Sequence, residues 1–518
     1  MDVVHLKLDK IGMNPEVGLE LVGRMGKNPK RLIHSHIELT ILLMILLLGL
    51  ILRVYDLGNE SLWLDEGFSI KFAKLSLSQI FFLQENSPPL YYVILHFWIN
   101  WFGDSEFSVR LPSAIFGFLS LFPMYAIGKH IFNREVGMLG LLLLSLSKFH
   151  IHYSQEARTY SLTVLLTLLC IYFFLKLLKE INYAIIFGYI LFSTLLIYSH
   201  IYGLFILIFQ NIYIAALSLF SKEDYELKPS RWILIQIVII LLFAPWVDIF
   251  INRIVAIQNS FWIATPSLSS IKRSFIAYSG SQSLLYLYML IFLFSICQFE
   301  KISGNIKWVS IFQSIESYQW KLRLLNPEKI SLLLVWLLTP ILLPFIISQF
   351  STPIYHTKYT IIASLAFYLF VAKGINTIKH RYLKAAIMGL IIAFSLVGIR
   401  GYFTKIMNEQ WRDVAKYIDT HAAGNDIILF YPDIQDIIFN YYSKRTELAQ
   451  KGFRQDNQNY LKELYPTVNS YKRVWVVIRY PTDNKELVVQ KLIENYNLSF
   501  QQQYEGIHLL LFENGEPL

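Results

Sequence analysis

Charged residues are scarce in this chain. Asp, Glu, Lys and Arg make up 16% of the 518 residues, whereas hydrophobic residues make up 55% and the mean hydropathy is +0.44. Soluble domains typically carry about 25% charged residues. The composition therefore excludes an ordinary soluble globule and predicts a polytopic α-helical membrane protein.

Cysteines and the familiar motifs of soluble enzymes are also lacking. The only cysteines, Cys170 and Cys297, lie within apolar runs, so no disulfide framework or CxxC pair is expected. No Walker A loop, GxSxG elbow or HExxH helix is present, which leaves nucleotide chemistry without support. The net charge of +9 is typical of cytoplasmic loops in a membrane chain, and no nucleic-acid partner is predicted.

What the chain has in abundance is apolar runs near the length that crosses a bilayer as a helix. We expect about eleven spans, near residues 37–53, 111–131, 137–152, 160–178, 183–200, 203–220, 231–249, 283–298, 330–349, 357–373 and 385–400. The shorter run PPLYYVILHFW, residues 88–98, predicts a helix that lies in the membrane interface or is only partly inserted.

Basic residues in the connections predict the orientation. If the leader, residues 1–36, is cytoplasmic, the other cytoplasmic connections are all basic, and the opposite loops hold acidic residues such as Asp56 and Asp104. The first span is expected to be a retained anchor rather than a cleaved signal. We thus expect a transmembrane domain over 37–400, with a first outer loop at 54–110, and an extracytoplasmic domain over 401–518.

The tail beyond Gly401 has the pattern of a small α/β domain. Strand-like runs DIILFYP, RVWVVIRYP and IHLLLFE alternate with helix-like runs WRDVAKYIDTHA and NKELVVQKLIENY. Its role stays open between a lid that stabilises the membrane domain and a part of the acceptor site.

Four polar motifs fall in the outer loops. They are WLDEG (63–67), SPPLYY with FGDSEFSVRLPSAIFG (87–92 and 102–117), FHIHYSQEARTY (149–160) and STPIYHTKYT (351–360).

In the long spans, by contrast, charged residues cluster at the ends. Ion-coupled transporters commonly need ionisable groups near the midplane, so a lipid or glycan transporter, or a membrane scaffold, is kept as the alternative to an enzyme.

The order and spacing of these motifs, over residues 37–375, resemble the GT-C glycosyltransferases of the family that includes protein O-mannosyltransferases and lipid A aminoarabinose transferases. The resemblance implies an enzyme that takes a sugar from a polyprenyl-phosphate carrier and passes it, with inversion, to a lipid, glycan or protein acceptor on the outer face. It also implies a place in the bacterial inner membrane, with a periplasmic active site. Asp65 matches the family's acidic residue of the first outer loop, Glu66 its acidic neighbour, and QEAR with Tyr160 the second outer-loop pattern.

Sugar transfer from a polyprenyl phosphate, the reaction that the resemblance implies, requires the same residue types. A carboxylate such as Asp65 can accept the proton of an attacking hydroxyl, and a fixed cation can stabilise a departing phosphate. Arg158 offers a planar fork for phosphate oxygens, and Lys358 a point charge. Lys358, before Tyr359, stands where such proteins more usually have arginine. As alternatives, Asp65 could cap a helix that begins at Glu66, and Arg158 could be a helix-end charge that reaches toward water.

The remaining candidates have less defined roles. Glu66 either orients the base or acceptor or is a solvated charge. Glu156 is two residues from Arg158, so only a local turn would let both point into one cavity. His152, Tyr153 and His200 are expected to line the pocket. No cofactor is predicted; a divalent metal stays a weaker alternative, because His150 and His152 share a face only on an extended segment.

Overall fold

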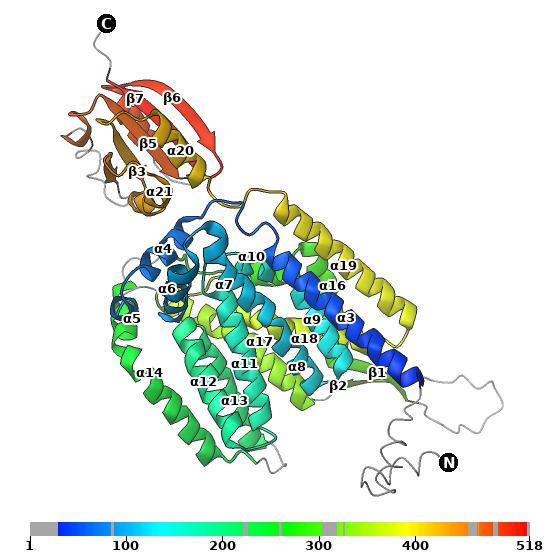
Figure 1. Cartoon of the computed structure of the whole chain (residues 1–518). Helices are drawn as coiled ribbons and strands as arrows, with labels where there is room; N and C mark the ends of the chain where they lie inside the picture. Colours follow the sequence, from blue (N-terminus) through cyan, green and yellow to red (C-terminus); the bar gives the residue numbers. More distant parts are fainter. Residues whose placement is uncertain are drawn as a thin grey trace, which may run out of the picture.

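The apolar runs fold into a bundle of helices, and the tail forms a small α/β domain at one end of it (Figure 1). The computed structural model describes residues 29–83, 87–220, 226–257, 262–302, 319–324, 327–453, 464, 466–479 and 485–514. Most of the predicted leader, residues 1–28, lies outside this description. The fold class expected from the sequence is confirmed.

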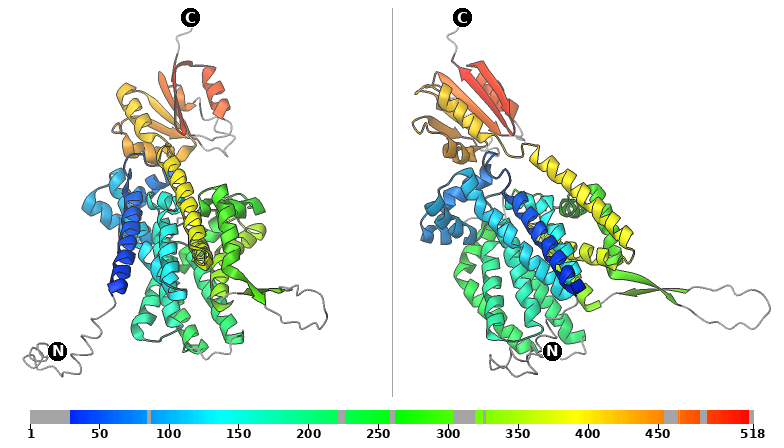
Figure 2. Two further views of the ribbon diagram at one scale, coloured as in Figure 1. Left: turned by 90° about the vertical axis from the view of Figure 1, so that its right-hand side faces the viewer. Right: turned by 45° about the vertical axis from the view of Figure 1, so that its right-hand side comes forward.

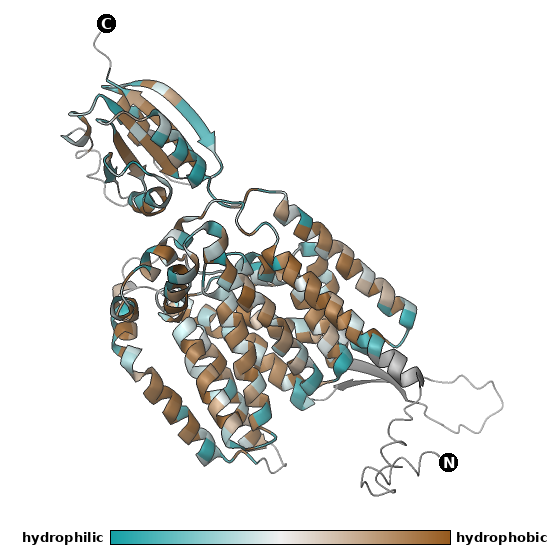
Figure 3. Cartoon of the chain, viewed as in Figure 1, coloured by the Kyte–Doolittle hydropathy of each residue, from teal (hydrophilic) through white to brown (hydrophobic). Residues whose placement is uncertain are grey.

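Seven spans are long and apolar enough to cross a membrane within the described ranges. They are formed by α3 (Pro29–Val54), α7 (Glu106–Leu119) with α8 (Leu121–Ile131), α11 (Tyr160–Leu177), α13 (Gly203–Phe220), α14 (Pro229–Ile257), α17 (Pro327–Phe350) and α19 (Arg381–Phe403). Figure 3 shows that hydrophobic residues run along these helices and that hydrophilic ones gather at their ends. The chain is therefore an integral membrane protein.

The other predicted spans correspond to bent or shorter helices. The pair α9 (Arg134–Ser145) and α10 (Lys148–Ser154) is bent by 61°, and the pair α15 (Leu268–Ser279) and α16 (Gln282–Ile296) by 91°. Counting each pair as one span gives up to 9. The shorter apolar helices α12 (Tyr183–Ser199) and α18 (Ile361–Thr377) account for the two remaining predicted runs, so the predicted number is roughly right.

A buried arginine supports the break between α9 and α10. Arg53, at the end of α3, is fully buried and donates to the carbonyl oxygens of Gly49 at 2.9 Å and Leu144 at 3.1 Å. Carbonyls in the last turn of a helix lack partners within the helix, and a cation is favourable there. Ser147 then caps α10 by accepting from the His150 N–H. The break redirects the chain toward residues 155–159.

The segment predicted to be the first outer loop contains three helices, α4 (Leu64–Ala73), α5 (Leu77–Phe81) and α6 (Leu90–Phe102). Helix α6 is the predicted interfacial helix. It buries Tyr91, Tyr92 and Leu95 and exposes Trp101 and Phe102, as expected of an aromatic face at a membrane surface.

The C-terminal domain is a mixed five-stranded sheet in the order β4-β3-β5-β7-β6. Its strands are β3 (Ile427–Tyr431), β4 (Ala449–Gly452), β5 (Arg473–Arg479), β6 (Asn497–Tyr504) and β7 (Ile507–Glu513), and its helices include α20 (Trp411–His421), α21 (Asp436–Tyr442) and α23 (Lys485–Ile493). Strand β3 is parallel to β4 and β5, whereas β7 is antiparallel to β5 and β6. The three predicted strands and two predicted helices are present; β4, β6 and α21 were not anticipated.

A two-stranded antiparallel ribbon, β1 (Cys297–Ile302) with β2 (Gln319–Leu324), projects from the bundle on the side away from the C-terminal domain (Figure 2). The start of α3 lies at that same end. The two ends of the bundle thus differ clearly: one carries α4 and the α/β domain, the other the basic connections.

One hydrophobic core continues from the bundle into the C-terminal domain. Helix α18, buried along nearly its whole length, packs on α9, α16 and α17 at the centre of the bundle. The same cluster of buried side chains extends through Leu62 and Leu64 to Trp411 and Ile438 of the tail. A separate core, which includes Val474 and Leu492, fills the opposite face of the sheet.

Candidate functional site

Asp65 lies in the first turn of α4, between two cations. Its Oδ2 is 3.8 Å from Nη2 of Arg158 and 3.5 Å from Nζ of Lys358, and its side chain is 30% exposed. Both separations exceed an ordinary hydrogen bond, so a ligand can exchange with either contact. Because α4 begins at Leu64, with Trp63 at the N-cap position, Asp65 does not serve as the helix cap.

Arg158 comes from residues 155–159, which connect α10 to α11. Its Nη1 donates to the carbonyl oxygen of Asp65 and to Oγ of Ser69, each at 3.3 Å. Burial lowers the pKa of Arg158, but the nearby Asp65 carboxylate raises it by more, so the pKa lies above its usual range. The guanidinium is thus a permanent positive charge that is tied to α4 and does not reach out to the surface.

Lys358 comes from residues 351–360, which connect α17 to α18. Its side chain is 12% exposed. The Nζ atom lies 5.2 Å from the ring centre of Trp262 and 5.7 Å from those of Trp63, Tyr160 and Tyr359. Ring faces attract a cation at such distances. The aromatic side chains and the Asp65 carboxylate together hold a largely buried ammonium group.

Two neutral histidines border this charged cluster. The ring of Tyr359 is 5.0 Å from that of His200 and 5.6 Å from that of His356. Burial, with the positive charges of Arg158 and Lys358, lowers the pKa of His200 to about 3. Burial and nearby Lys358 and Arg273 lower the pKa of His356 to about 4. At neutral pH both rings are uncharged, so Arg158 and Lys358 carry the positive charge near Asp65.

An apolar cavity of about 370 Å³ adjoins the cluster. His200 and Tyr359 line the side of the cavity that faces the cluster. Its apolar walls include Phe205 of α13, Trp246 of α14 and Ile347 of α17. The cavity and the cluster together therefore match a ligand that has a charged head and an apolar body.

Glu66 points to a different set of partners from its neighbour Asp65. It is fully buried, and Arg110 donates to its two carboxylate oxygens from Nε at 2.8 Å and Nη2 at 2.7 Å. The backbone N–H groups of Ala157 and Trp63 also donate to it. The interpretation as a solvated charge is therefore wrong. Glu66 thus ties α4 to α7 and to the Arg158 segment.

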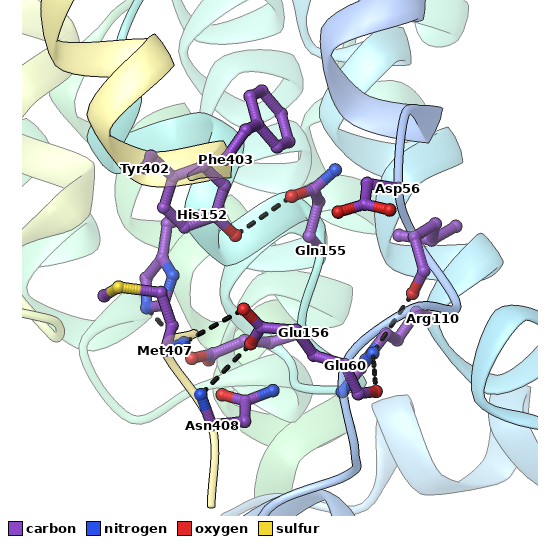
Figure 4. Close-up of a pocket in the computed structure, with 11 residues that line it drawn as sticks. Asp56, Glu60, Arg110, His152, Gln155, Glu156, Tyr402, Phe403, Met407 and Asn408 are labelled. Carbon is purple, nitrogen blue, oxygen red and sulfur yellow. Dashed lines mark hydrogen bonds and ion pairs between the residues drawn. The ribbon is translucent and has the colours of Figure 1, made fainter. Parts of the chain in front are cut away.

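Glu156 and His152 line a second, smaller pocket, whose residues Figure 4 shows. His152 Nε2 is 3.1 Å from Glu156 Oε1. This pocket has walls from Asp56, Glu60, Arg110 and α19, and none from Asp65, Arg158 or Lys358. The turn at 155–159 does not bring Glu156 and Arg158 into one cavity, because it directs the two side chains to different sides.

Tyr153 and Tyr160 lie between the two groups. The ring of Tyr153 is 4.8 Å from that of His152 and 4.9 Å from that of Tyr160, and Tyr160 faces Lys358. Of the sequence candidates, the structure therefore brings together Asp65, Arg158, Lys358, Tyr160, Tyr359 and His200. As to metal, no group of three or more His, Cys, Asp or Glu side chains that could hold an ion occurs among the described residues.

Sequence reasoning missed Arg110 and Trp262. Arg110 was visible as a lone arginine in the apolar run FSVRLPS, and a charge in such a run signals a buried partner. Trp262 offers no comparable signal, because it reaches Lys358 only through the fold.

Comparison with known proteins agrees with this architecture. Residues 86–248 match the family model described as dolichyl-phosphate-mannose-protein mannosyltransferase. A search of curated proteins found no match.

Several solved membrane proteins share the fold. ArnT from Cupriavidus metallidurans in the apo state has a TM-score of 0.60 and 10% identity, over 91% of this chain and 97% of that one. The same protein bound to undecaprenyl phosphate has a TM-score of 0.57, with the same identity and coverage. The apo oligosaccharyltransferase of Archaeoglobus fulgidus has a TM-score of 0.51 and 11% identity, over 85% of this chain and 69% of that one.

Proposed function

We propose that the chain is a GT-C glycosyltransferase, which moves a sugar from a polyprenyl-phosphate carrier to an acceptor on the outer face of the membrane, with inversion at the anomeric carbon. The single observation that best supports this is the position of Asp65, 3.8 Å from Arg158 and 3.5 Å from Lys358. A potential base and two potential phosphate ligands thus meet at one place.

The adjoining cavity accounts for the lipid part of the donor. Its apolar walls suit a polyprenyl chain, and the side lined by His200 and Tyr359 lies next to Lys358, whose charge suits the phosphate. ArnT has been solved with undecaprenyl phosphate bound, and we propose the same class of carrier for this chain.

In the proposed reaction the phosphate oxygens engage Lys358 and Arg158 and release the Asp65 carboxylate. Asp65 then accepts the proton of the acceptor hydroxyl as its oxygen bonds to the anomeric carbon. The bond from that carbon to the phosphate oxygen breaks on the opposite face of the sugar, and the carrier phosphate keeps the electron pair. The two cations stabilise the charge that develops there, which favours the transition state over the ground state.

Donor-dependent transfer by the purified protein tests this function. The protein in detergent, without any ion gradient, is incubated with polyprenyl-phosphate sugars, and mass spectrometry of the co-purified lipid indicates which carrier to use. Sugar transfer without a gradient is the expected result. Gradient-dependent movement of an intact lipid or glycan, with no bond exchanged, would support the transporter instead.

Replacement of the base gives a sharper test. Asp65→Asn keeps the size of the side chain but removes the proton acceptor, so we expect transfer to fall by about 10²- to 10⁴-fold. Yield, membrane insertion and thermal stability are measured alongside. Near-normal turnover of a well-folded Asp65→Asn protein would eliminate the proposed role of Asp65.

A further inference from the structure

The C-terminal domain contacts the part of the first outer loop that leads into α4. Residues 57–62 have no helix or strand, so their peptide groups need partners elsewhere. Arg110 of the bundle donates hydrogen bonds to the carbonyl oxygens of Leu57, Glu60 and Ser61. Further contacts come from the tail.

Arg412 of α20 is the main contact from the tail. Its Nη1 donates to the Asn59 carbonyl oxygen at 3.1 Å, and its Nη2 to that of Gly58 at 3.4 Å. The same guanidinium donates to Oε1 of Glu106 at 2.6 and 2.9 Å. Burial lowers the pKa of Arg412, but Glu106 raises it by more, so its pKa lies above the usual range. One side chain of the tail thus joins the loop to the start of α7.

Helix α21 packs directly against α4. The hydroxyl of Tyr442 accepts from the Leu62 N–H at 2.7 Å and donates to Glu106 Oε1 at 3.1 Å. A Cβ atom on Gly67 would lie 3.4 Å from Cβ of the fully buried Ile438. Gly67 is two residues after Asp65, so α21 contacts the helix turn that carries the proposed base.

The connection between the domains adds two more fixed points. The Glu60 carboxylate accepts from the backbone N–H groups of Met407 and Asn408 at 2.9 and 3.0 Å, and Asn408 Nδ2 donates to the Ser61 carbonyl oxygen at 3.0 Å. The hydrophobic core is also continuous across this junction. Such a junction resembles the interior of one domain more than a contact that opens and closes.

We infer that the C-terminal domain is a fixed support for α4, in which Arg412 and Tyr442 act as positioning residues for Asp65, and that the domain does not open as a lid during turnover. The catalytic part of this inference rests on the proposed function, whereas the docking itself does not. Small displacements of a catalytic group reduce rates strongly, so loosening α4 lowers kcat while the carrier site formed by Arg158 and Lys358 keeps its affinity.

Matched arginine variants test the positioning role. Arg412→Ala is compared with Arg445→Ala, because Arg445 also binds carbonyl oxygens and a carboxylate, at Ala422, Asp419 and Glu447, but entirely within the tail. Tyr442→Phe is compared with Tyr496→Phe, whose hydroxyl donates to Val468 and Tyr471 within the tail. We expect Arg412→Ala to lower kcat at least 10-fold, while KM for the donor stays within about 3-fold of the wild-type value. The same variant should speed hydrogen exchange over residues 64–73. Equal effects of both arginine variants on exchange over 64–73 would overturn the inference.

A cross-link distinguishes a support from a lid. Gly67→Cys with Ile438→Cys places two Cβ atoms near the roughly 3.5 to 4.5 Å that a disulfide spans; both native cysteines are replaced by alanine. We expect spontaneous cross-linking, seen as a gel shift that dithiothreitol reverses, and equal turnover in the oxidised and reduced states. Loss of turnover on oxidation that dithiothreitol restores would show a lid.

Absence of transfer by the wild-type chain would reject only the proposed function, because the gel shift and hydrogen exchange report docking without it.

Discussion

At the residue scale, adjacent side chains take separate roles because a helix turns them apart. Asp65 and Glu66 follow each other on α4, yet Asp65 faces Arg158 and Lys358, while Glu66 is buried against Arg110. Successive residues on a helix point in directions about 100° apart. A pair of carboxylates in a motif therefore provides one candidate base and one structural anchor.

The two cations predict how carrier binding responds to mutation. Arg158→Ala or Lys358→Ala removes charge-assisted hydrogen bonds to phosphate, each about 1.5–3 kcal/mol, so the Kd for undecaprenyl phosphate should rise by roughly 10- to 150-fold. The measurement is equilibrium binding in detergent. Lys74→Ala is the control, because Lys74 pairs with Asp104 on the exposed part of the 54–110 segment that carries Asp65. Equal Kd values for all variants would refute the phosphate role.

The histidines predict a pH dependence of stability. In the unfolded chain His200 titrates near its ordinary pKa, about 6.5, whereas in the folded chain its pKa is about 3. Between these values the unfolded state binds an extra proton, so stability is greatest above pH 6.5 and falls as the pH decreases toward 3. His200→Asn should make the fall of Tm between pH 7.5 and 5 smaller by a few degrees. The exposed His421→Asn variant should behave like the wild type, and an unchanged slope for His200→Asn would contradict the prediction.

At the element scale, broken and closely packed helices shape the site. The bend between α9 and α10, supported by Arg53, delivers the chain to the Arg158 segment. Polar side chains join α11, α12 and α13: Gln210 Nε2 donates to Cys170 Sγ at 3.4 Å, and the Tyr189 hydroxyl donates to Gln210 Oε1 at 2.7 Å. Such contacts hold membrane helices together where lipid offers no hydrophobic drive.

Close approach of α16 and α18 depends on one glycine. A Cβ atom on Gly374 would lie 2.1 Å from the Ile291 carbonyl oxygen, so Gly374→Ala forces the helices apart and should cost about 1–3 kcal/mol or more. Gly389 of α19 has no neighbour within 4 Å of such an atom among the residues described, and Gly389→Ala should be neutral or slightly stabilising. Thermal unfolding in detergent compares the two. A lower Tm for Gly389→Ala than for Gly374→Ala would contradict this account of the packing.

At the scale of the whole molecule, the proposed site and the basic connections lie at opposite ends of the bundle. The end that carries α4 also carries the C-terminal domain, and the start of α3 lies at the other (Figure 1). The distribution of basic residues favours a cytoplasmic position for the latter. On this basis we expect the proposed active site to be extracytoplasmic, where we propose that a lipid carrier presents its sugar.

Reporter fusions test this orientation. A phosphatase that folds only outside the cytoplasm should be active when fused after residue 518, and a cytoplasmic fluorescent reporter should be bright when fused before residue 1. A phosphatase fused after Lys179, in the connection between α11 and α12, serves as the internal control and should be inactive. The reverse pattern would place Asp65 on the cytoplasmic side and exclude the proposed reaction.

The sequence by itself determined the membrane class, nearly every apolar helix, the α/β character of the tail and three members of the charged cluster. These features follow from local patterns, namely hydropathy over about 20 residues and alternation along strands. The two cations near Asp65 could be proposed because they lie in short motifs at one predicted face.

Only the tertiary structure decided which of these groups meet. Arg110 reaches Glu66 across 44 residues, and Arg412 reaches Glu106 across 306. No local pattern encodes such pairs, because they depend on how whole helices pack. Packing decides which charges become buried, and a buried charge without a partner is costly. For the same reason the sequence left the role of the C-terminal domain open, and its contact with α4 became visible only in the fold.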